Sequence, residues 1–499
     1  MKKIRLSPFL RDLVTTGATS IITVVCLIVM TRWLATGLGP DGFGVYALSK
    51  RIVSYLLPVV TMGMSIAIAR SLAVVQTPAD RQRVLLGGLL LGIVPGVVVF
   101  MFGWVWSEPL AAWAFNGPGY QQVWMVVVFM LLTYSLYTML YAVYRGLGRM
   151  NRANLWQLAL IVVGPLLITW WLAGPGRVMD ILLGMSILLG VSIIPLGWMV
   201  IHGLRVSMTY PSHPQACLRS LASYGIPRMP AGFALAGILA VGPLLAPHYG
   251  TVADAGYLVA GQSVFALAGT GIVAFGLIVL PHAAKLFAAG NIVFLRERIA
   301  DVLEFAVHVG LFVSIHLAIW ARPMLIVWLG EDYAAAVPLM RIMIIGLLPN
   351  LIYVMARSLI DAVETRAVNT INLLTAFVVT AAASGLTSVM GCGLVGLAAS
   401  TALGLLVLAV MTLRYLWRSG WLLTGTIKAM VPGRILLVNL ILGIVALVIY
   451  YFAWPDQPHR ACLTAFMVEG LVVAVYILFL YRWKIGWIRQ ITARMFALS

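Results

Sequence analysis

Long apolar segments follow one another along the whole chain, with only short polar connections between them. A helix that spans a bilayer needs roughly 20 predominantly apolar residues, and about fourteen segments of this kind can be placed. They are too long and too uniformly apolar for the alternating strands of a membrane β-barrel. The pattern therefore predicts an all-α polytopic membrane protein without a large domain outside the bilayer. The predicted spanning helices lie near 10–35, 42–69, 84–106, 122–144, 153–174, 178–201, 220–246, 253–284, 299–320, 336–360, 367–388, 394–413, 434–454 and 461–481.

Positive charge collects in every second connection between these predicted helices. The odd-numbered connections contain only Arg177, Arg322 and Arg460 among the Lys and Arg residues. The even-numbered connections, the first of which contains Arg70, Arg81 and Arg83, and both ends are rich in them. By the positive-inside rule, this asymmetry predicts a bacterial inner-membrane protein with both termini in the cytoplasm. The formal net charge of +18 is then explained by topology and by contact with anionic membrane lipids, and we expect no nucleic-acid partner.

The two halves of the chain resemble each other in several short stretches that occur in the same order. Residues 10–17, 41–47 and 106–110 are similar to residues 218–225, 254–260 and 320–324. Duplication predicts two parallel six-helix repeats around a central cavity: an N-lobe at 1–203 and a C-lobe at 204–418. Two further helices and a cytoplasmic tail occupy 419–499. Transporters built from parallel repeats commonly bind substrate between the halves and move by alternating access.

Charged residues lie inside the second predicted helix. Lys50 and Arg51 are roughly 10 Å from its external end, at 1.5 Å per residue. Ser54, Pro58, Thr61 and Ser65 follow Lys50 at helical spacing, so that they share one face with it. A cation at the centre of a spanning helix costs roughly 2.5–3.5 kcal/mol. The stripe of polar residues therefore favours the wall of an aqueous cavity, and the alternative is snorkelling to the interface.

The first predicted helix carries a second polar face. Its members are Asp12, Thr16, Thr19, Thr23 and Cys26, spaced by three or four residues. This face either lines the same cavity or forms hydrogen bonds to neighbouring helices, since small polar residues also connect helices in membranes. Arg32 lies nearly opposite this face on an ideal helix, which favours an interfacial anchor.

Two more predicted helices contain charges at membrane depth. The seventh contains Tyr224-Gly-Ile-Pro-Arg-Met-Pro230, where the glycine and prolines predict a kink. Arg228 lies at this kink, and broken helices often line substrate sites, so we expect Arg228 to line the cavity. Glu469 lies in the middle of the last predicted helix, where it is protonated, paired or a proton-coupling group. Asp12 is a second candidate for coupling, whereas His308 and His316 are interpreted as residues that pack or form hydrogen bonds between helices.

Known catalytic and metal-binding patterns are missing from the sequence. It contains no phosphate-binding G-x-x-x-x-G-K-[ST] loop, no H-E-x-x-H and no G-x-S-x-G. The four cysteines are far apart and form no C-x-x-C pair. We therefore expect neither an enzyme nor a protein with a metal or another cofactor.

One segment resembles a known family. Thr31-Arg-Trp-Leu-Ala-Thr-Gly-Leu-Gly-Pro-Asp-Gly-Phe-Gly-Val-Tyr-Ala-Leu48 is similar to the connection between helices 1 and 2 of polysaccharide exporters, and Met62–Ala73 resembles the segment after it. The chain thus resembles Wzx-type polysaccharide flippases of the multidrug/oligosaccharidyl-lipid/polysaccharide (MOP) exporter superfamily. The resemblance implies two six-helix lobes around a central cavity, often with two extra C-terminal helices. It covers the whole chain only in helix number and repeat.

The resemblance also implies a substrate. Members of the family move undecaprenyl-diphosphate-linked oligosaccharide across the cytoplasmic membrane, and cationic N-lobe residues receive the diphosphate. Arg32 matches the basic position of the motif, and Lys50 and Arg51 follow in helix 2, so these residues and Arg228 are the expected diphosphate ligands. Thr16, Thr19, Thr23, Ser54 and Thr61 are the expected polar lining of the cavity. The expected partners are the lipid-linked substrate, membrane lipids and other polysaccharide-assembly proteins.

Other functions are compatible with parts of the pattern. A cation-coupled drug or metabolite antiporter of the same superfamily usually has twelve helices and an acidic cavity, whereas the deep charges here are mostly basic. A peptidoglycan-precursor flippase has a similar helix count. An enzyme or a scaffold of envelope-glycan assembly is a further alternative. Contacts to sugar are expected from side chains that packing explains equally well, such as Tyr55, Tyr134, Tyr137, Asn154 and Gln157.

Overall fold

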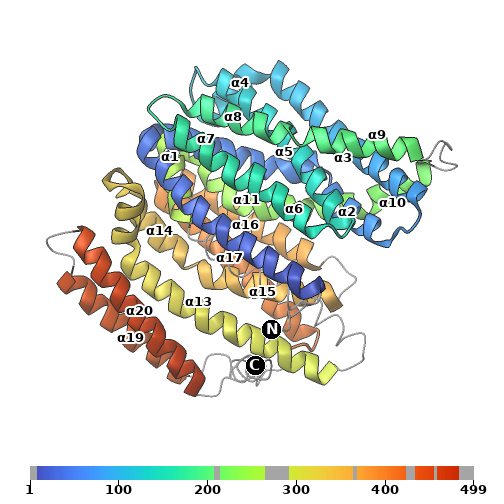
Figure 1. Cartoon of the computed structure of the whole chain (residues 1–499). Helices are drawn as coiled ribbons and strands as arrows, with labels where there is room; N and C mark the ends of the chain where they lie inside the picture. Colours follow the sequence, from blue (N-terminus) through green and yellow to red (C-terminus); the bar gives the residue numbers. More distant parts are fainter. Residues whose placement is uncertain are drawn as a thin grey trace, which may run out of the picture. The chain divides into compact units, whose positions relative to one another are not determined.

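The computed structural model describes residues 8–206, 214–263, 292–363, 368–422, 433–453 and 458–482. Every regular element in these ranges is a helix (Figure 1). The chain divides into two compact units: unit 1 comprises Met1–Val259 and Leu373–Ser400, and unit 2 comprises Ala260–Asn372 and Thr401–Ser499. The predicted lobes, 1–203 and 204–418, are defined by the sequence repeat rather than by compactness, and they stay a prediction.

The helices follow one another with short connections. In chain order they are α1 (Pro8–Val60), α2 (Met64–Val74), α3 (Pro78–Val105), α4 (Ser107–Phe115), α5 (Gln121–Gly146), α6 (Met150–Gln157), the π-helix η1 (Leu158–Val163), α7 (Gly164–Leu172), α8 (Val178–Gly190), α9 (Ile193–Val206), α10 (Pro214–Gly225), the 3₁₀ turn η2 (Ile226–Arg228), α11 (Met229–Leu245), η3 (Ala246–His248), α13 (Ile292–Leu329), η4 (Glu331–Tyr333), α14 (Ala336–Ile344), α15 (Leu347–Val363), α16 (Val368–Val389), α17 (Gly393–Arg418), α19 (Gly433–Ala453) and α20 (Pro458–Arg482).

The helices have the length and polarity of membrane spans. Within the described residues, 9 helices are long and apolar enough to cross a bilayer, or up to 10 if the bent pair α14 and α15 counts as one span. Large apolar side chains face outward, for example Val98 (62% exposed) and Trp171 (81%), whereas Ser49 and Thr412 are fully buried. A surface this apolar suits lipid rather than water. The predicted class of all-α polytopic membrane protein is confirmed; the count of about fourteen and the side of each terminus stay predictions.

Helix α1 joins the first two predicted helices, and the second of them ends before its predicted boundary. Gly39 interrupts α1 with φ 68°, a left-handed value that favours glycine, and Pro40 begins the second limb. This break lies between the predicted ranges 10–35 and 42–69. The second limb ends at Val60, and a turn through Met62 (φ 46°) and Gly63 (φ 70°) leads into α2. The prediction of one unbroken helix over 42–69 is therefore wrong.

Glycines allow close packing between two of the stretches that resemble each other. A Cβ on Gly44 would overlap the backbone of Val252, and a Cβ on Gly256 would lie 3.1 Å from the Cα of Gly44. Gly44 belongs to the stretch 41–47, and Gly256 belongs to its counterpart 254–260. The matching stretches of the two halves therefore meet backbone to backbone within unit 1, where no larger residue fits.

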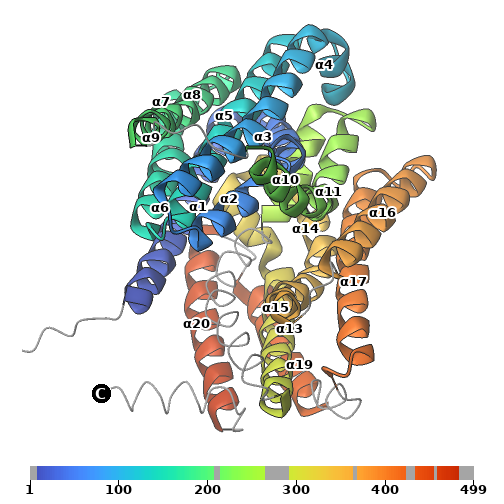
Figure 2. The same cartoon turned by 90° about the vertical axis from the view of Figure 1, so that its right-hand side faces the viewer.

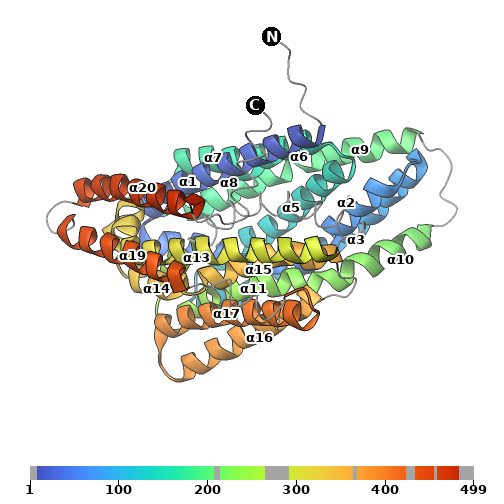
Figure 3. The same cartoon turned by 90° about the horizontal axis from the view of Figure 1, so that it is seen from below.

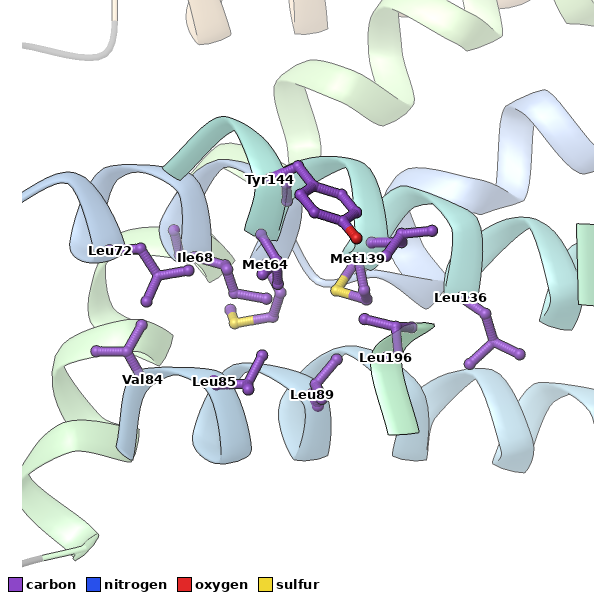
Figure 4. Packing of buried hydrophobic residues seen from close by; sticks show 14 of the residues in the cluster. Met64, Ile68, Leu72, Val84, Leu85, Leu89, Leu136, Met139, Tyr144 and Leu196 are labelled. Atoms are coloured by element: carbon purple, nitrogen blue, oxygen red, sulfur yellow. The ribbon is translucent and has the colours of Figure 1, made fainter. Parts of the chain in front are cut away.

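An apolar core holds the first helices of unit 1 together. Met64, Ile68 and Leu72 of α2 pack against Leu85 of α3 and Met139 of α5 (Figure 4). Helix α10 packs on α2 and α3 beside this core (Figure 3). The core fixes α2 and α10 next to each other, which matters for the charged residues that these helices carry.

A short helix occupies a region expected to be a loop. Helix α4 lies between α3 and α5, and Asn116 ends it in a left-handed conformation (φ 51°). Glu108 in its first turn favours the helix N-terminus electrostatically. The Gln121 amide donates to the Ser107 hydroxyl at 3.0 Å, which connects this helix to the start of α5. Its 9 residues are too few to span a bilayer.

Unit 2 contains a long central helix and the C-terminal helix pair. Helix α13 has 38 residues and packs against α14, α15, α19 and α20 (Figures 1 and 2). Helices α14 and α15 are bent by 47° where one predicted helix, 336–360, was expected. Phe312 of α13 and Tyr476 of α20 stack with 4.3 Å between ring centroids, which helps to hold α20 on α13.

Candidate functional site

Lys50 lies in the second limb of α1, facing α5. Its Nζ is 5.4 Å from the centroid of the Tyr134 ring, and the side chain is half-buried. Among the described residues it forms no ion pair and no hydrogen bond. A buried cation is ordinarily paired with a carboxylate. An aromatic ring orients the ammonium through its negative face without neutralising it, so that its three donors remain available.

The ring beneath Lys50 belongs to a row of tyrosines on α5. Tyr134 meets Tyr137 edge to face with 5.8 Å between ring centroids, and Tyr137 and Tyr141 are 6.1 Å apart. These residues are three and four positions apart, so they share one face of the helix. Tyr137 is 7% exposed. The expected sugar contact at Tyr134 therefore lies beside the candidate cation, whereas Tyr137 packs behind it.

The other polar residues of this limb lie on both sides of it. Arg51 is half-buried and is rotated by roughly 100° from Lys50 about the helix axis. Ser54 is exposed, and its hydroxyl donates to the carbonyl of Arg51 at 3.0 Å. Thr61 is 3% exposed and donates to the Leu57 carbonyl at 2.9 Å, next to the turn at Met62. Thr61 thus lies at the end of α1, where it satisfies a backbone carbonyl.

The threonines of the first limb connect helices as well as their own backbone. The Asn154 amide of α6 donates to the Thr16 hydroxyl at 3.2 Å. Thr19 and Thr23 donate to carbonyls one turn before them, each at 2.8 Å. Such bonds to the preceding turn satisfy a hydroxyl inside an apolar environment. Their role in lining a cavity stays a prediction.

Arg228 lies where the sequence predicted a break. The helix is interrupted by η2 between α10 and α11, and Arg228 is exposed there. Its guanidinium lies 3.6 Å above the Tyr224 ring and donates from Nη1 to the Tyr224 carbonyl at 2.8 Å. Arg70 of α2 contacts the same ring at 4.1 Å. Sequence reasoning counted Arg70 only as a positive residue of a connection and missed its contact with Tyr224.

The remaining candidates are spread over both units. Arg32 is exposed on the first limb of α1. Glu469 of α20 accepts hydrogen bonds from His316 Nδ1 at 2.8 Å and from Trp320 Nε1, both on α13. Glu469 is therefore hydrogen-bonded to α13, and His316 forms a hydrogen bond between helices, one of the two roles expected of it. The side chain of Asp12 falls outside the described residues. In the part of the chain that is described, no group of three His, Cys, Asp or Glu side chains could hold a metal ion.

Solved structures share this fold. The lipid II flippase MurJ in an inward closed conformation superimposes with a TM-score of 0.72 at 13% identity, over 94% of this chain and 98% of that chain. An inward-facing multidrug resistance MATE family transporter of the MOP superfamily gives 0.68 at 12% identity, over 83% and 99%. A MOP superfamily transporter from Pyrococcus furiosus, described as having a binding pocket of reverse polarity, gives 0.56 at 14% identity, over 82% and 95%. At such identities the similarity shows the fold.

The sequence itself matches a family. No curated protein matches the chain significantly. The family model described as polysaccharide biosynthesis protein matches residues 12–287, more than half of the chain. The match includes Thr31–Leu48, the segment that carried the resemblance, together with Lys50 and Arg228. The expected resemblance to polysaccharide exporters is confirmed, and the chain belongs to the polysaccharide biosynthesis protein family of multi-pass membrane proteins.

Proposed function

We propose that the protein flips undecaprenyl-diphosphate-linked oligosaccharide across the bacterial inner membrane by alternating access. The observation that carries this proposal is Lys50, a half-buried cation inside a spanning helix whose described contact is the Tyr134 ring. A polyprenyl tail is soluble in lipid, whereas a diphosphate is not, so a flippase needs positive charge where the diphosphate crosses. Both termini would be cytoplasmic.

The energies of the cation favour an anionic ligand. A lysine at the centre of a spanning helix is unfavourable by roughly 2.5–3.5 kcal/mol. An aromatic ring returns about 0.5–2 kcal/mol, depending on desolvation. The Tyr134 ring therefore leaves part of the unfavourable term uncompensated. Charge-assisted hydrogen bonds to phosphate oxygens would supply the rest, because they are stronger in a medium of low dielectric constant.

The other candidates have supporting roles in this proposal. Arg51, Arg32 and Arg228 provide further positive charge, and Thr16, Thr19, Thr23, Ser54 and Thr61 provide polar lining. Glu469 and Asp12 are the carboxylates that could couple transport to protons. The protein would act as a transporter rather than an enzyme. Membrane lipids and other polysaccharide-assembly proteins would be its partners.

The test is a flipping assay in liposomes with a fluorescent undecaprenyl-diphosphate oligosaccharide. A lost charge-assisted hydrogen bond is worth about 1.5–3 kcal/mol, so Lys50→Ala should slow flipping roughly tenfold to a hundredfold. Lys50→Arg, which keeps the charge, should restore part of the rate, and Arg51→Ala should slow it too. Arg145→Ala is the matched control, because Arg145 also lies over a tyrosine, Tyr141 at 5.7 Å. If Lys50→Ala flips as fast as the unaltered protein, Lys50 does not bind the diphosphate.

A peptidoglycan-precursor flippase is the second candidate, favoured by the shared fold with the lipid II flippase MurJ. The same liposomes decide between them when lipid II replaces the oligosaccharide lipid. Faster movement of lipid II would favour the second candidate. Movement of neither lipid, together with uptake of an organic cation driven by an ion gradient, would favour an antiporter like the MATE transporter that shares the fold.

A further inference from the structure

Two arginines that contact one tyrosine ring form a second group of positive charge in unit 1. Arg70 of α2 and Arg228 of η2 both lie over the ring of Tyr224 of α10, with Cζ to ring-centroid distances of 4.1 Å and 3.6 Å. We call Arg70, Tyr224 and Arg228 the Tyr224 clamp. Lys50 lies about 15 Å of helical rise before the end of α1. The turn at Met62 follows, and Arg70 of the clamp comes after this turn.

The local packing explains how residues so far apart in sequence meet. A Cβ on Gly63 would overlap the backbone of Gly225, so the turn before α2 presses directly on the end of α10. The methyl group of Met64 fills the space where a Cβ on Gly225 would lie. Tyr224 immediately precedes this contact and packs against the apolar core formed by α2, α3, α5 and α9. The ring is therefore held by the core, and the two arginines are held by the ring.

The clamp carries more positive charge than its surroundings compensate. Neither Arg70 nor Arg228 forms an ion pair with a carboxylate in the described part of the chain. Both side chains are exposed. The two guanidinium carbons are less than about 8 Å apart, as the two distances to one ring require, and like charges at this separation repel each other.

The available donors suit phosphate oxygens. A guanidinium has five N–H donors in a planar fork that matches phosphate geometry. Arg228 uses Nη1 on the Tyr224 carbonyl, and the described contact of Arg70 is the ring alone. Most donors of the clamp are therefore available to a ligand. A ring that both guanidiniums contact restricts their motion, which reduces the entropy lost on binding.

We propose that the Tyr224 clamp binds a phosphate-type dianion and is a docking point for the substrate diphosphate, separate from Lys50. The second part of this inference rests on the proposed function. Two anion-binding sites in one unit would let the diphosphate leave the first only as it meets the second, so that its charge stays compensated along the route. The same chemistry is offered by anionic phospholipid headgroups, which are the other source of phosphate at a membrane protein.

The first experiment measures binding of inorganic pyrophosphate to the full-length protein in a lipid-free uncharged detergent, by isothermal titration calorimetry. Arg70→Gln and Arg228→Gln are each expected to weaken binding by about tenfold or more, as loss of a charge-assisted contact predicts. Arg145→Gln is the matched control, because Arg145 lies over one tyrosine without a second arginine, and it should leave the affinity unchanged. Unchanged affinity in both clamp variants would overturn the proposal.

A change of the ring separates the clamp geometry from net charge. Tyr224→Phe keeps the aromatic face and should bind pyrophosphate as the unaltered protein does. Tyr224→Leu keeps both arginines but removes the face that orients them, so its affinity should fall although the charge is the same. Equal affinities of Tyr224→Leu and the unaltered protein would mean that the ring orients nothing. Thermal melting of each variant establishes that it is folded, and Arg228→Lys serves as a milder change.

Two further arms identify the source of the phosphate and keep this inference distinct from the proposed function. In nanodiscs, added phosphatidylglycerol should leave pyrophosphate binding intact if the clamp binds the substrate. Displacement of pyrophosphate by this lipid would overturn the substrate role and mean that the clamp binds lipid headgroups. In the flipping assay, clamp variants should slow movement of the diphosphate lipid. Normal flipping by variants that have lost pyrophosphate binding would also overturn the docking role. Failure of Lys50→Ala to slow flipping would count against the Lys50 site alone.

Discussion

Replacing Glu469 with alanine should loosen the attachment of α20 to α13. The Glu469 carboxylate accepts hydrogen bonds from His316 Nδ1 at 2.8 Å and from Trp320 Nε1. His316 and Trp320 are four residues apart on α13, so both donors are on one face of that helix. The side chains of His316 and Glu469 are 7% and 20% exposed. One carboxylate therefore serves two donors in a largely buried position.

The expected loss can be bounded from two kinds of measurement. Hydrogen bonds between helices in a membrane average about 0.6 kcal/mol and reach about 1.7 kcal/mol. Breaking a buried ion pair in a water-soluble protein costs about 3–5 kcal/mol. The membrane values apply here, because an unfolded helix in lipid also finds partners. With two donors left without an acceptor, we expect Glu469→Ala to lower the free energy of unfolding by about 1–3 kcal/mol.

A double-mutant cycle isolates this interaction. Unfolding is followed by titration with sodium dodecyl sulfate in micelles for Glu469→Ala, His316→Ala and the double variant. The loss of unfolding free energy in the double variant should be smaller, by about 0.5 kcal/mol or more, than the sum of the losses in the two single variants. Ser314→Ala is the control, because this hydroxyl is buried on the same helix and has no hydrogen-bond partner among the described residues. Additive effects within about 0.3 kcal/mol would refute the interaction.

Three other measurements test the fold. Gly63→Leu should reduce the yield of folded protein, because Gly63 has φ 70° and an added side chain would overlap the Gly225 backbone. Gly385→Leu is the control, because Gly385 borders open space, and it should not reduce the yield. Equal yields of the two variants in size-exclusion chromatography would contradict the close contact. Thr77→Ala should destabilise the protein by about 1 kcal/mol in thermal melts, since the Thr77 hydroxyl caps α3 by accepting from Asp80 N at 3.1 Å. In a Cys462→Ser background, a membrane-impermeant maleimide should label exposed Cys392 in intact spheroplasts but not in sealed inverted vesicles; the reverse result would invert the predicted topology.

The helices were predictable because a bilayer imposes the same requirement on every span. Each span must be long, apolar and internally hydrogen-bonded, and these properties can be read from a local window of sequence. The break in the seventh predicted helix could also be predicted from the local sequence, because Gly225 and Pro227 disfavour a continuous helix. The turn at Met62 and Gly63 could not be predicted in this way, because a single glycine is common in spanning helices. This turn packs on the backbone of Gly225, more than a hundred residues away in the sequence.

The charged residues show the same limit. Lys50 and Arg228 were found because each charge lies inside an apolar segment. Their ring partners were harder to assign: Tyr134 was noted only as a possible sugar contact, and Arg70 appeared to be one more positive residue beside a connection. Glu469 was recognised as unusual, yet its partners, His316 and Trp320, lie on another helix some 150 positions earlier. Contacts between side chains on distant helices cannot be predicted from the local pattern of a single sequence.

The cations of unit 1 differ in the groups that they contact. Lys50, Arg70 and Arg228 each lie over a tyrosine ring, whereas Arg83 is paired with Asp80 at 2.9 Å. A carboxylate would neutralise a cation and compete with an incoming phosphate, but a ring only orients it. A cation on a ring thus keeps its charge and most of its donors for a ligand. An organic cation would be repelled at these positions, and the proposal of an anionic substrate is based on this difference.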